Sequence, residues 1–240
     1  MLGIILAGGT GTRLLPLTKV TNKHLLPVYD RPMIYYPLET LLKAGIREII
    51  IVTGKEHAGN FMALLASGSE FGARFAYVLQ EGAGGIAEAI GLAEPFANGE
   101  SIAVILGDNV LFDDVSREIA DFRSGCRIFL KEVPDPERFG VPEFGKGGDI
   151  INIEEKPNAP KSNYAVTGFY LYDSTVFRKI GMLKPSARGE LEVTDLNNVY
   201  LREGKLTHGY IKGPWIDAGT IDNLLTASNL ARERRAKRGQ

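Results

Sequence analysis

The chain has 240 residues, of which 44% are hydrophobic and 24% charged, the balance of an ordinary globular domain with a real core. A net charge of −1 argues against a nucleic-acid-binding surface, and no segment approaches the roughly 20 apolar residues of a membrane span. The single cysteine, Cys126, cannot form an internal disulfide, so we expect a reduced, cytoplasmic setting.

Apolar runs and helical patterns alternate through the first half of the chain. The pattern predicts strands at Gly3–Leu6, Glu48–Thr53, Arg74–Gln80 and Ser101–Leu106, with helices at Ile34–Ala44, Gly59–Ser67 and Ile86–Ala93. Continuous apolar strands separated by helices predict an α/β fold, a Rossmann-like doubly wound and mostly parallel sheet. Ligands of such sheets bind beyond the carboxyl ends of the strands, so the loops that follow these four strands should face the site.

The second half contains strands with few helices between them, which predicts a mixed or antiparallel extension of the same sheet. Strands are expected at Cys126–Val133, Asp149–Glu154, Tyr164–Tyr172 and Leu206–Lys212, and helices near Ser174–Met182, Thr194–Glu203 and Thr220 to Arg235. No linker separates the halves, so residues 1–240 are treated as one domain divided at about residue 125. The basic tail from Ala231 to Gln240 is interpreted as the solvated end of a helix rather than a nucleic-acid arm.

The first strand leads into a glycine-rich loop that ends in a cation, Leu6-Ala7-Gly8-Gly9-Thr10-Gly11-Thr12-Arg13. Glycines at 8, 9 and 11 allow backbone N–H groups to approach phosphates closely. The loop is not a dinucleotide fingerprint, because no third glycine has the required spacing, and no Gly-Lys-Ser/Thr follows to make a P-loop. Taken alone, the segment also suits a glycine-rich turn with a surface arginine.

The loop continues into a longer and more specific pattern. The stretch from Leu6 to Pro37, LAGGTGTRLLPLTKVTNKHLLPVYDRPMIYYP, closely resembles the signature of glucose-1-phosphate thymidylyltransferases within the sugar-1-phosphate nucleotidylyltransferase family. Further motifs follow in the family's order almost to the C-terminus. They are Leu106–Asn109, Phe139–Val141, Glu154–Pro157, Tyr164–Tyr170, Pro185–Glu192 and Trp215–Thr220.

The resemblance implies an enzyme that transfers a nucleotidyl group from dTTP to glucose 1-phosphate, giving dTDP-glucose and pyrophosphate. It implies a nucleotide-binding half at about 1–125 and a sugar-binding half at about 126–240. The partners are then a nucleoside triphosphate and a hexose 1-phosphate, with no nucleic acid and no membrane. Many of the enzymes that the chain resembles continue past Thr220 with several helices, and since one helix is expected here, we predict a monomer or homodimer with weak feedback control.

Carried over residue by residue, the motifs imply a complete site. The catalytic cations are Arg13 and Lys23, and a Mg²⁺ cofactor is held by Asp108 and Asp217. The nucleotide is assigned to Leu6, Gly8, Gly9, Gly11, Gln80 and Gly85. The sugar phosphate is assigned to Gly140, Glu155, Lys156, Val166, Tyr170 and Arg188. An aspartate at a strand end is often only a turn residue, Glu155 and Lys156 could be a surface ion pair, and an aromatic residue such as Tyr170 is commonly core.

These residue types suit the reaction because its difficulty is electrostatic. A phosphate monoester has a second pKa near 6, so the sugar phosphate is already an ionised nucleophile and needs no general base. Bringing two polyanions together calls for cations and a metal held by carboxylates. The histidines, His24, His57 and His208, lie in no triad setting and are interpreted as structural or surface residues.

Two segments depart from the family pattern. Thymidylyltransferases usually have Gln-Pro-x-Pro-x-Gly where this chain has Gln80-Glu81-Gly82-Ala83-Gly84-Gly85, so base discrimination could be looser. Thr53–His57 also differs from the usual Thr-Pro-x-Asp. The alternatives left open are a UTP-using or broad-specificity transferase, one using CTP or ATP, a silent nucleotide-sugar-binding regulatory subunit, and a nicotinamide-dependent oxidoreductase.

Overall fold

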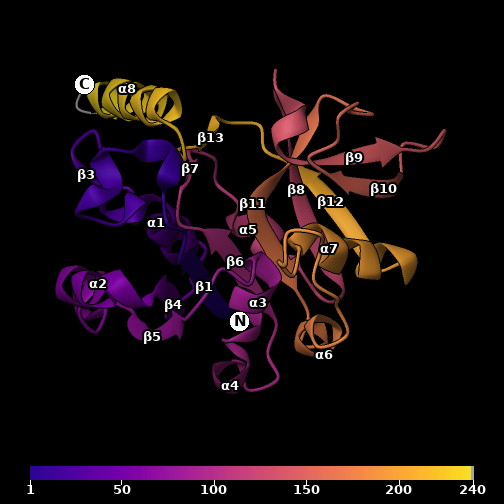
Figure 1. The fold of residues 1–240 in the computed structure, drawn as a ribbon, viewed down its shortest axis with the longest axis horizontal. Coiled ribbons are helices and arrows are strands. Elements are labelled where there is room, and N and C mark those ends of the chain that lie inside the picture. The colour runs from indigo at the N-terminus through magenta and orange to yellow at the C-terminus, as the bar shows by residue number, and fades with distance from the viewer. Residues whose placement is uncertain (239–240) are drawn as a thin grey trace.

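A seven-stranded sheet runs through the centre of the molecule, in the order β12-β8-β11-β6-β1-β4-β5 (Figure 1). The computed structural model describes residues 1–238; Gly239 and Gln240, at the end of the basic tail, lie outside the described residues. The strands are β1 (Leu2–Ala7), β4 (Glu48–Gly54), β5 (Arg74–Gln80), β6 (Ile102–Leu106), β8 (Cys126–Glu132), β11 (Tyr164–Tyr172) and β12 (Leu206–Tyr210). Every neighbouring pair is parallel except the two pairs made by β11, which confirms the predicted mostly parallel α/β sheet.

Helices cover both faces of this sheet. One face carries α1 (Tyr35–Lys43), α2 (Ala58–Leu65) and α5 (Ser116–Ala120), and the other carries α3 (Ile86–Gly91), α4 (Glu94–Ala97), α6 (Val176–Ile180) and α7 (Val193–Arg202). Successive strand residues point to opposite faces, so Ile4 lies in one core cluster and Ile5 in the other. Both faces are therefore apolar, and the strands read as unbroken hydrophobic runs.

Three two-stranded sheets lie outside the main sheet. They are β2 (Pro27–Val28) with β3 (Arg31–Pro32), β9 (Gly140–Phe144) with β10 (Ile150–Glu155), and β7 (Asn109–Leu111) with β13 (Trp215–Asp217). The strand predicted at Asp149–Glu154 exists as β10, but it pairs with β9 instead of joining the main sheet. Strands as short as β7 and β13 have too few residues to show a period in the sequence.

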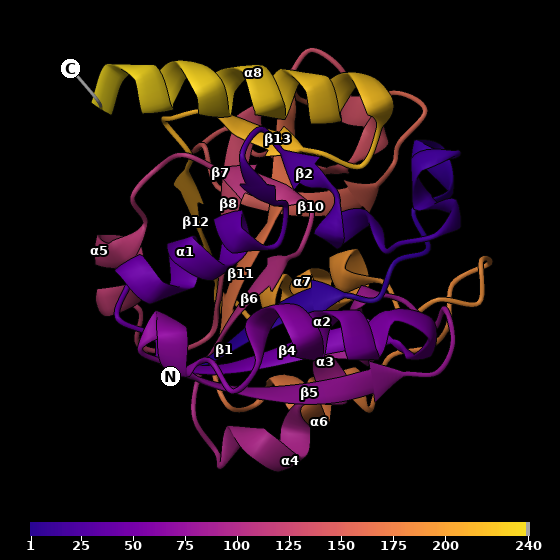
Figure 2. The same cartoon turned by 90° about the vertical axis from the view of Figure 1, so that its left-hand side faces the viewer.

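The last helix, α8 (Ile221–Arg238), lies across β2 and β13 (Figure 2). Beneath it is a third apolar cluster, which includes Val28, Val110, Ala218 and Ala227. This cluster fixes the position of β13 and β7. Within residues 1–238, no helix combines the length and apolar character needed to cross a membrane.

Candidate active site

The loops that follow β1, β4, β5 and β6 meet at the carboxyl edge of the sheet, as predicted. The backbone N–H of Gly107 donates to Leu6 O at 2.9 Å. A Cβ atom at Gly8 would lie 2.9 Å from Gln80 Oε1 and 3.7 Å from Gly54 N. The glycine-rich loop therefore lies between the end of β6 and the ends of β4 and β5.

The buried side chains of Asn22 and His24 fix the chain on both sides of Lys23. Asn22 Oδ1 accepts from the backbone N–H of His24 at 2.9 Å and lies 2.7 Å from its ring Nδ1, while Asn22 Nδ2 donates to Ala7 O at 3.3 Å. Burial lowers the pKa of His24 to about 3, and the positive charge of Lys23 is the second cause of this shift. The ring is therefore neutral near pH 7. The structural role predicted for His24 fits its place beneath the loop.

The side chain of Lys23 extends along the glycine-rich loop to a carboxylate. A Cβ atom at Gly9 would lie 3.1 Å from Lys23 Cε and 3.4 Å from Nζ, and one at Gly11 would lie 3.0 Å from Lys23 Cβ. Gly11 also has a φ of +66°, a conformation that favours glycine. At the end of this path the ammonium makes a buried ion pair with Asp108 Oδ2. A phosphate lying on the loop would therefore meet Lys23 directly.

Asp108 and Asp217 are brought together by the small sheet of β7 and β13. In the antiparallel pair of β7 and β13, Asp217 is opposite Asn109, and the backbone N–H of Ala218 donates to Asp108 O at 2.9 Å. A Cβ atom at Gly219 would lie 2.9 Å from Asp217 Oδ1, 3.0 Å from Arg13 Nη2 and 3.4 Å from Asp108 Oδ2. Both carboxylates and the Arg13 guanidinium thus surround one glycine.

The two carboxylates have opposite electrostatic environments. Burial, followed by the charge of Asp108, raises the pKa of Asp217. Burial acts in the same direction on Asp108, but the ion pair with Lys23 and the hydrogen bonds outweigh it and lower the pKa of Asp108. Asp108 is therefore a stable carboxylate, whereas Asp217 gains most from an additional cation.

Asn109 is a residue of the candidate site to which no role was assigned from the sequence. It is 3% exposed, and its Nδ2 donates to Asp108 Oδ1 at 3.1 Å. Its Oδ1 accepts from the backbone N–H of Gly168 at 2.9 Å and from Trp215 Nε1 at 2.7 Å. Asn109 thus connects Asp108, β11 and the strand that carries Asp217. The motifs around Asp108 and Asp217 contain Asn109 and Trp215, but only the fold brings the two motifs together.

The loop after β5 is bonded to the segment that carries Arg188. Gln80 Nε2 donates to Gly85 O at 3.2 Å, and Gly85 has a φ of +96°. The backbone N–H of Leu191 donates to Gly84 O at 2.8 Å, and a Cβ atom at Gly85 would lie 2.5 Å from Leu191 O. Although residues 81–83 are exposed, the end of this loop is fixed by main-chain contacts.

Glu155 lies where several predicted sugar-side residues meet. Its Oε2 accepts from Thr194 Oγ1 at 2.6 Å, and its Oε1 lies 3.3 Å from Lys156 Nζ and 3.8 Å from Arg188 Nη2. A Cβ atom at Gly140 would lie 3.6 Å from Glu155 Oε2. The structure therefore brings Gly140, Glu155, Lys156 and Arg188 into one group.

A ligand has less access to Arg188 and to Val166 and Tyr170, the two residues of β11 that were assigned to the sugar phosphate. Arg188 Nη2 lies 2.9 Å from both carboxylate oxygens of Glu192, so the guanidinium is already engaged by an acidic side chain. Val166 is 7% exposed and Tyr170 3% exposed, and both lie in the larger core cluster. Burial, with Glu155 next in effect, raises the pKa of Tyr170, so its hydroxyl stays protonated.

The carboxylate pair suits a hard divalent cation. Asp108 and Asp217 offer oxygen ligands of the kind that Mg²⁺ prefers, and they are held close to Arg13 and Lys23. Across residues 1–238, His, Cys, Asp and Glu side chains form no metal-binding group of three or more. Two protein carboxylates alone would leave most of an octahedral shell to water and phosphate oxygens.

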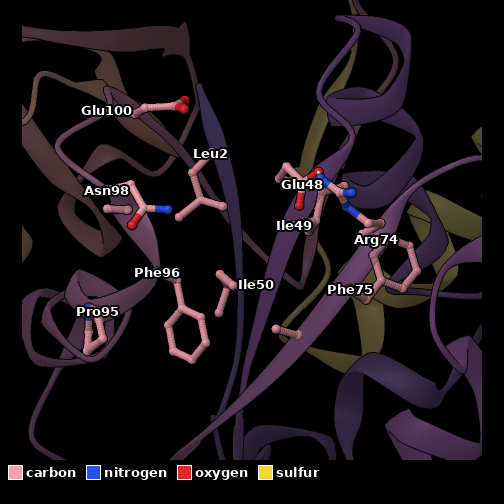
Figure 3. A pocket seen from close by; sticks show the side chains of 12 residues that line it. Leu2, Glu48, Ile49, Ile50, Arg74, Phe75, Pro95, Phe96, Asn98 and Glu100 are labelled. Carbon is pink, nitrogen blue, oxygen red and sulfur yellow. The ribbon is translucent and has the colours of Figure 1, made fainter.

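A hollow of about 480 Å³ opens at the opposite end of the sheet (Figure 3). Leu2, Ile50 and Phe96 line it, and Glu48 and Arg74 form an exposed ion pair at its rim. Glu48 and Arg74 are the first residues of β4 and β5, so this hollow lies at the amino ends of the strands. Ligands of parallel sheets bind at the carboxyl ends, where the charged groups gather.

Comparisons with known proteins identify the family of the chain. Residues 2–234 match the nucleotidyl transferase family. A glucose-1-phosphate thymidylyltransferase from Neisseria meningitidis serogroup A is 45% identical over 95% of this chain and 82% of its own length. A relative of the same name from Mycolicibacterium smegmatis is 44% identical over 100% of this chain and 85% of its own.

Solved structures show the same similarity. A Bacillus anthracis protein, described as a glucose-1-phosphate thymidylyltransferase and crystallised with sucrose, superposes with a TM-score of 0.92 and 54% identity, covering 97% of this chain and 96% of its own. A UDP-glucose pyrophosphorylase in complex with UDP-glucose superposes with a TM-score of 0.84 and 27% identity, covering 97% and 98%.

Proposed function

The chain belongs to the nucleotidyl transferase family, and from that premise we propose that it transfers the thymidylyl group of dTTP to glucose 1-phosphate, releasing pyrophosphate. The observation that carries the proposal is the convergence of Arg13, Lys23, Asp108 and Asp217 at the carboxyl edge of the sheet. Such a set of cations and carboxylates is what a reaction between two polyanions requires. Relatives named for this activity at 44 to 46% identity support the choice of substrates.

The nucleophile in this reaction is a phosphate oxygen of the sugar. It is ionised at neutral pH, so no side chain has to remove a proton from it. The site fits this chemistry, since the buried His24 has a pKa of about 3 and is fixed by Asn22. Catalysis then depends on alignment of the sugar phosphate with the α-phosphorus, opposite the leaving pyrophosphate.

The cations of the glycine-rich loop act on the triphosphate in this proposal. Lys23 lies along Gly9 and Gly11, so its ammonium can serve both Asp108 and an α-phosphate on the loop. Arg13 is exposed at the end of the loop, next to Gly219, where it can stabilise the charge that develops on pyrophosphate. Both act only if phosphate enters between the loop and the carboxylates.

We infer that Asp108 and Asp217 together hold one Mg²⁺ ion with the nucleotide. The ion, when bound, would neutralise phosphate charge and polarise the phosphoryl oxygens. Because burial and mutual repulsion disfavour two charged carboxylates, the pair should bind the ion weakly until triphosphate oxygens complete the shell. Asn109 keeps Asp108 in position by donating to its Oδ1.

On the sugar side, Glu155 is proposed to accept hydrogen bonds from hexose hydroxyls. Lys156 and Arg188 lie on either side of it and are proposed to bind the sugar phosphate, with backbone groups of Gly140 and Val166 completing the pocket. Arg188 would have to share its guanidinium between phosphate and Glu192. Tyr170 is too buried to reach a ligand without movement, so its proposed contribution is to support the pocket from behind.

UTP is the second candidate donor. The loop from Gln80 to Gly85 lacks the family's prolines, and the UDP-glucose pyrophosphorylase neighbour shares the fold over nearly the whole chain. A silent regulatory subunit would be expected to have lost one of the four central charged residues, and all are present. We also propose that the protein acts as a monomer or homodimer.

We expect dTTP with α-glucose 1-phosphate to give dTDP-glucose and pyrophosphate, and UTP to be a weaker donor. The expectation depends on Gln80 and Gly85, the two residues of the loop assigned to the base. The measurement is pyrophosphate release over a matrix of four nucleoside triphosphates and several hexose 1-phosphates. Faster release with CTP or ATP than with either dTTP or UTP would contradict the assigned base specificity.

Alanine at Gly85 should impair both substrates. Its Cβ would meet Leu191 O at 2.5 Å, and φ is +96°, so the loop and the Arg188 segment would be forced apart. Displacements near 1 Å cost up to about a hundred-fold, so we expect kcat/KM for both substrates to fall roughly ten- to a hundred-fold. Gly82→Ala is the matched control, because no atom lies within 4 Å of a Cβ there. Equal kinetics for the two variants would show that the contact is unimportant.

A further inference from the structure

Arg138 lies beside the carboxylate pair, although no motif assigned it a role. Its Nη2 is 3.9 Å from Asp217 Oδ2, too far for a hydrogen bond. The side chain is 31% exposed overall, yet the Nη2 atom is buried and has no hydrogen-bond partner among the described residues. Buried guanidinium N–H groups without a partner are uncommon, and this one faces a metal-site carboxylate.

The position of Arg138 is built by its surroundings. It ends a short turn, η6 (Pro136–Arg138), and its Nη1 donates to Asp135 Oδ2 at 2.5 Å. The guanidinium lies 5.4 Å above the Phe139 ring, and that ring meets Trp215 edge-on at 5.4 Å. Trp215 begins β13, the strand that carries Asp217. Arg138 and Asp217 are therefore held by the same packed aromatic pair.

The two carboxylates of the site differ in their ion pairs. Asp108 pairs directly with Lys23. Among residues 1–238, Arg138 is the only side-chain cation within 4.0 Å of the Asp217 carboxylate. Within the described residues, the Asp217 carboxylate receives one hydrogen bond, from the backbone N–H of Gly219 at 3.1 Å. The Arg138 guanidinium therefore approaches this carboxylate without bonding to it.

We propose that Arg138 is a positioning residue for Asp217, a resident positive charge that holds this carboxylate in its orientation before the divalent cation binds. The inference rests on the proposed function, because it assumes that Asp108 and Asp217 hold the metal. A fixed positive charge a few ångströms from the site repels an incoming cation. Arg138 therefore also weakens binding of the bare metal, so that the ion enters with the triphosphate, whose charge outweighs this repulsion.

The two parts of this role predict opposite effects of removing the charge. In Arg138→Gln, Mn²⁺ should bind the substrate-free protein about three- to ten-fold more tightly, because a repulsive charge is lost. Turnover should nevertheless fall roughly ten-fold, because Asp217 loses the group that orients it. A purely structural role for Arg138 would weaken Mn²⁺ binding and turnover together.

The experiment titrates Mn²⁺ into the substrate-free protein and follows free Mn²⁺ by electron paramagnetic resonance. Arg138→Lys keeps the charge and should retain the wild-type dissociation constant, with turnover between wild type and Arg138→Gln. Arg123→Gln is the matched control, since Arg123 donates to Ala120 O and Phe122 O on the surface. It should leave both quantities unchanged. If Arg138→Gln binds Mn²⁺ as weakly as wild type or more weakly, the proposed role of Arg138 is wrong.

The result is separable from that of the proposed function. If wild type makes dTDP-glucose but Arg138→Gln leaves Mn²⁺ affinity unchanged, the inference about Arg138 fails alone. If Arg138→Gln tightens Mn²⁺ binding while wild type forms no sugar nucleotide, the proposed reaction fails and the role of Arg138 at a cation site remains. Should Arg138→Gln fold poorly, Arg138→Met in the same titration provides the uncharged side chain.

Discussion

Replacing Asp217 with Asn is expected to lower turnover about a thousand-fold and to raise the Mg²⁺ concentration needed for half-maximal activity. The substitution removes one of two protein charges on the ion at nearly constant volume, and loss of such electrostatic stabilisation costs several kcal/mol. Asp108→Asn should behave alike. The double variant should be little worse than the worse single variant, because the pair acts as a unit. The measurement is initial rate against Mg²⁺ concentration for all four proteins.

The same variants should differ in stability. Asp108→Asn leaves the partly buried ammonium of Lys23 without its partner and should lower the melting temperature. Asp217 has a pKa that folding raises, so its charge destabilises the folded state at any pH above its unfolded pKa. Asp217→Asn should therefore leave the melting temperature unchanged or raise it.

An unchanged Mg²⁺ dependence of the rate in either single variant, or activity losses that simply multiply in the double variant, would contradict a shared ion.

Arg13→Ala is expected to lower turnover roughly a hundred-fold or more, the scale for removing one preorganised charge-stabilising group. Arg13 is exposed on the loop, so its removal should not change the melting temperature. Its Nη2 lies 3.0 Å from the position that a Cβ atom would take at Gly219, close to the two carboxylates. Turnover and thermal unfolding, measured side by side, separate the two effects.

The control for Arg13 is Lys19→Ala. Lys19 is an exposed cation six residues further along the same loop, and its side chain makes no hydrogen bond or ion pair within the part of the chain that the structure describes. Its loss should alter neither turnover nor stability. Equal turnover for Arg13→Ala and wild type would remove Arg13 from the catalytic group, and equal losses for both variants would indicate a general field rather than a placed charge.

The main sheet was predictable because its strands are buried on both faces. Runs such as Glu48–Thr53 and Ser101–Leu106 contain apolar residues at nearly every position, and all of the strands predicted in the first half were confirmed as β1, β4, β5 and β6. The hairpin of β9 and β10 was harder to predict from the sequence, because Gly140–Phe144 includes a proline and two residues that are only half-buried. Its pairing with Ile150–Glu155 depends on contacts outside the main sheet.

The family motifs implied that Asp108 and Asp217 lie at one Mg²⁺ site, but they did not indicate which strands bring the two residues together. Asp108 follows β6 of the main sheet, and the antiparallel pair of β7 and β13 brings Asp217 beside it. Three-residue strands leave no periodic signal, and their pairing depends on the packing of α8 over Val110 and Ala218. This packing joins segments more than 100 residues apart.

Asn109, Glu192 and Arg138 could not have been assigned from the sequence. Each of them lies beside a charged residue only in the folded chain: Asn109 beside Asp108, Glu192 beside Arg188 and Arg138 beside Asp217. A motif indicates which residue types are present at a site. It does not indicate which of their atoms still lack a partner.

In the proposed reaction, a phosphate oxygen of glucose 1-phosphate is the nucleophile that attacks the α-phosphorus of dTTP. The most direct test uses glucose 1-phosphate whose phosphate oxygens all carry ¹⁸O, with dTTP, Mg²⁺ and mass analysis of both products. We predict dTDP-glucose that retains every labelled oxygen, and unlabelled pyrophosphate formed in equal amount. Label in the pyrophosphate, or pyrophosphate release without a labelled sugar nucleotide, would show that the sugar phosphate oxygen is not the nucleophile.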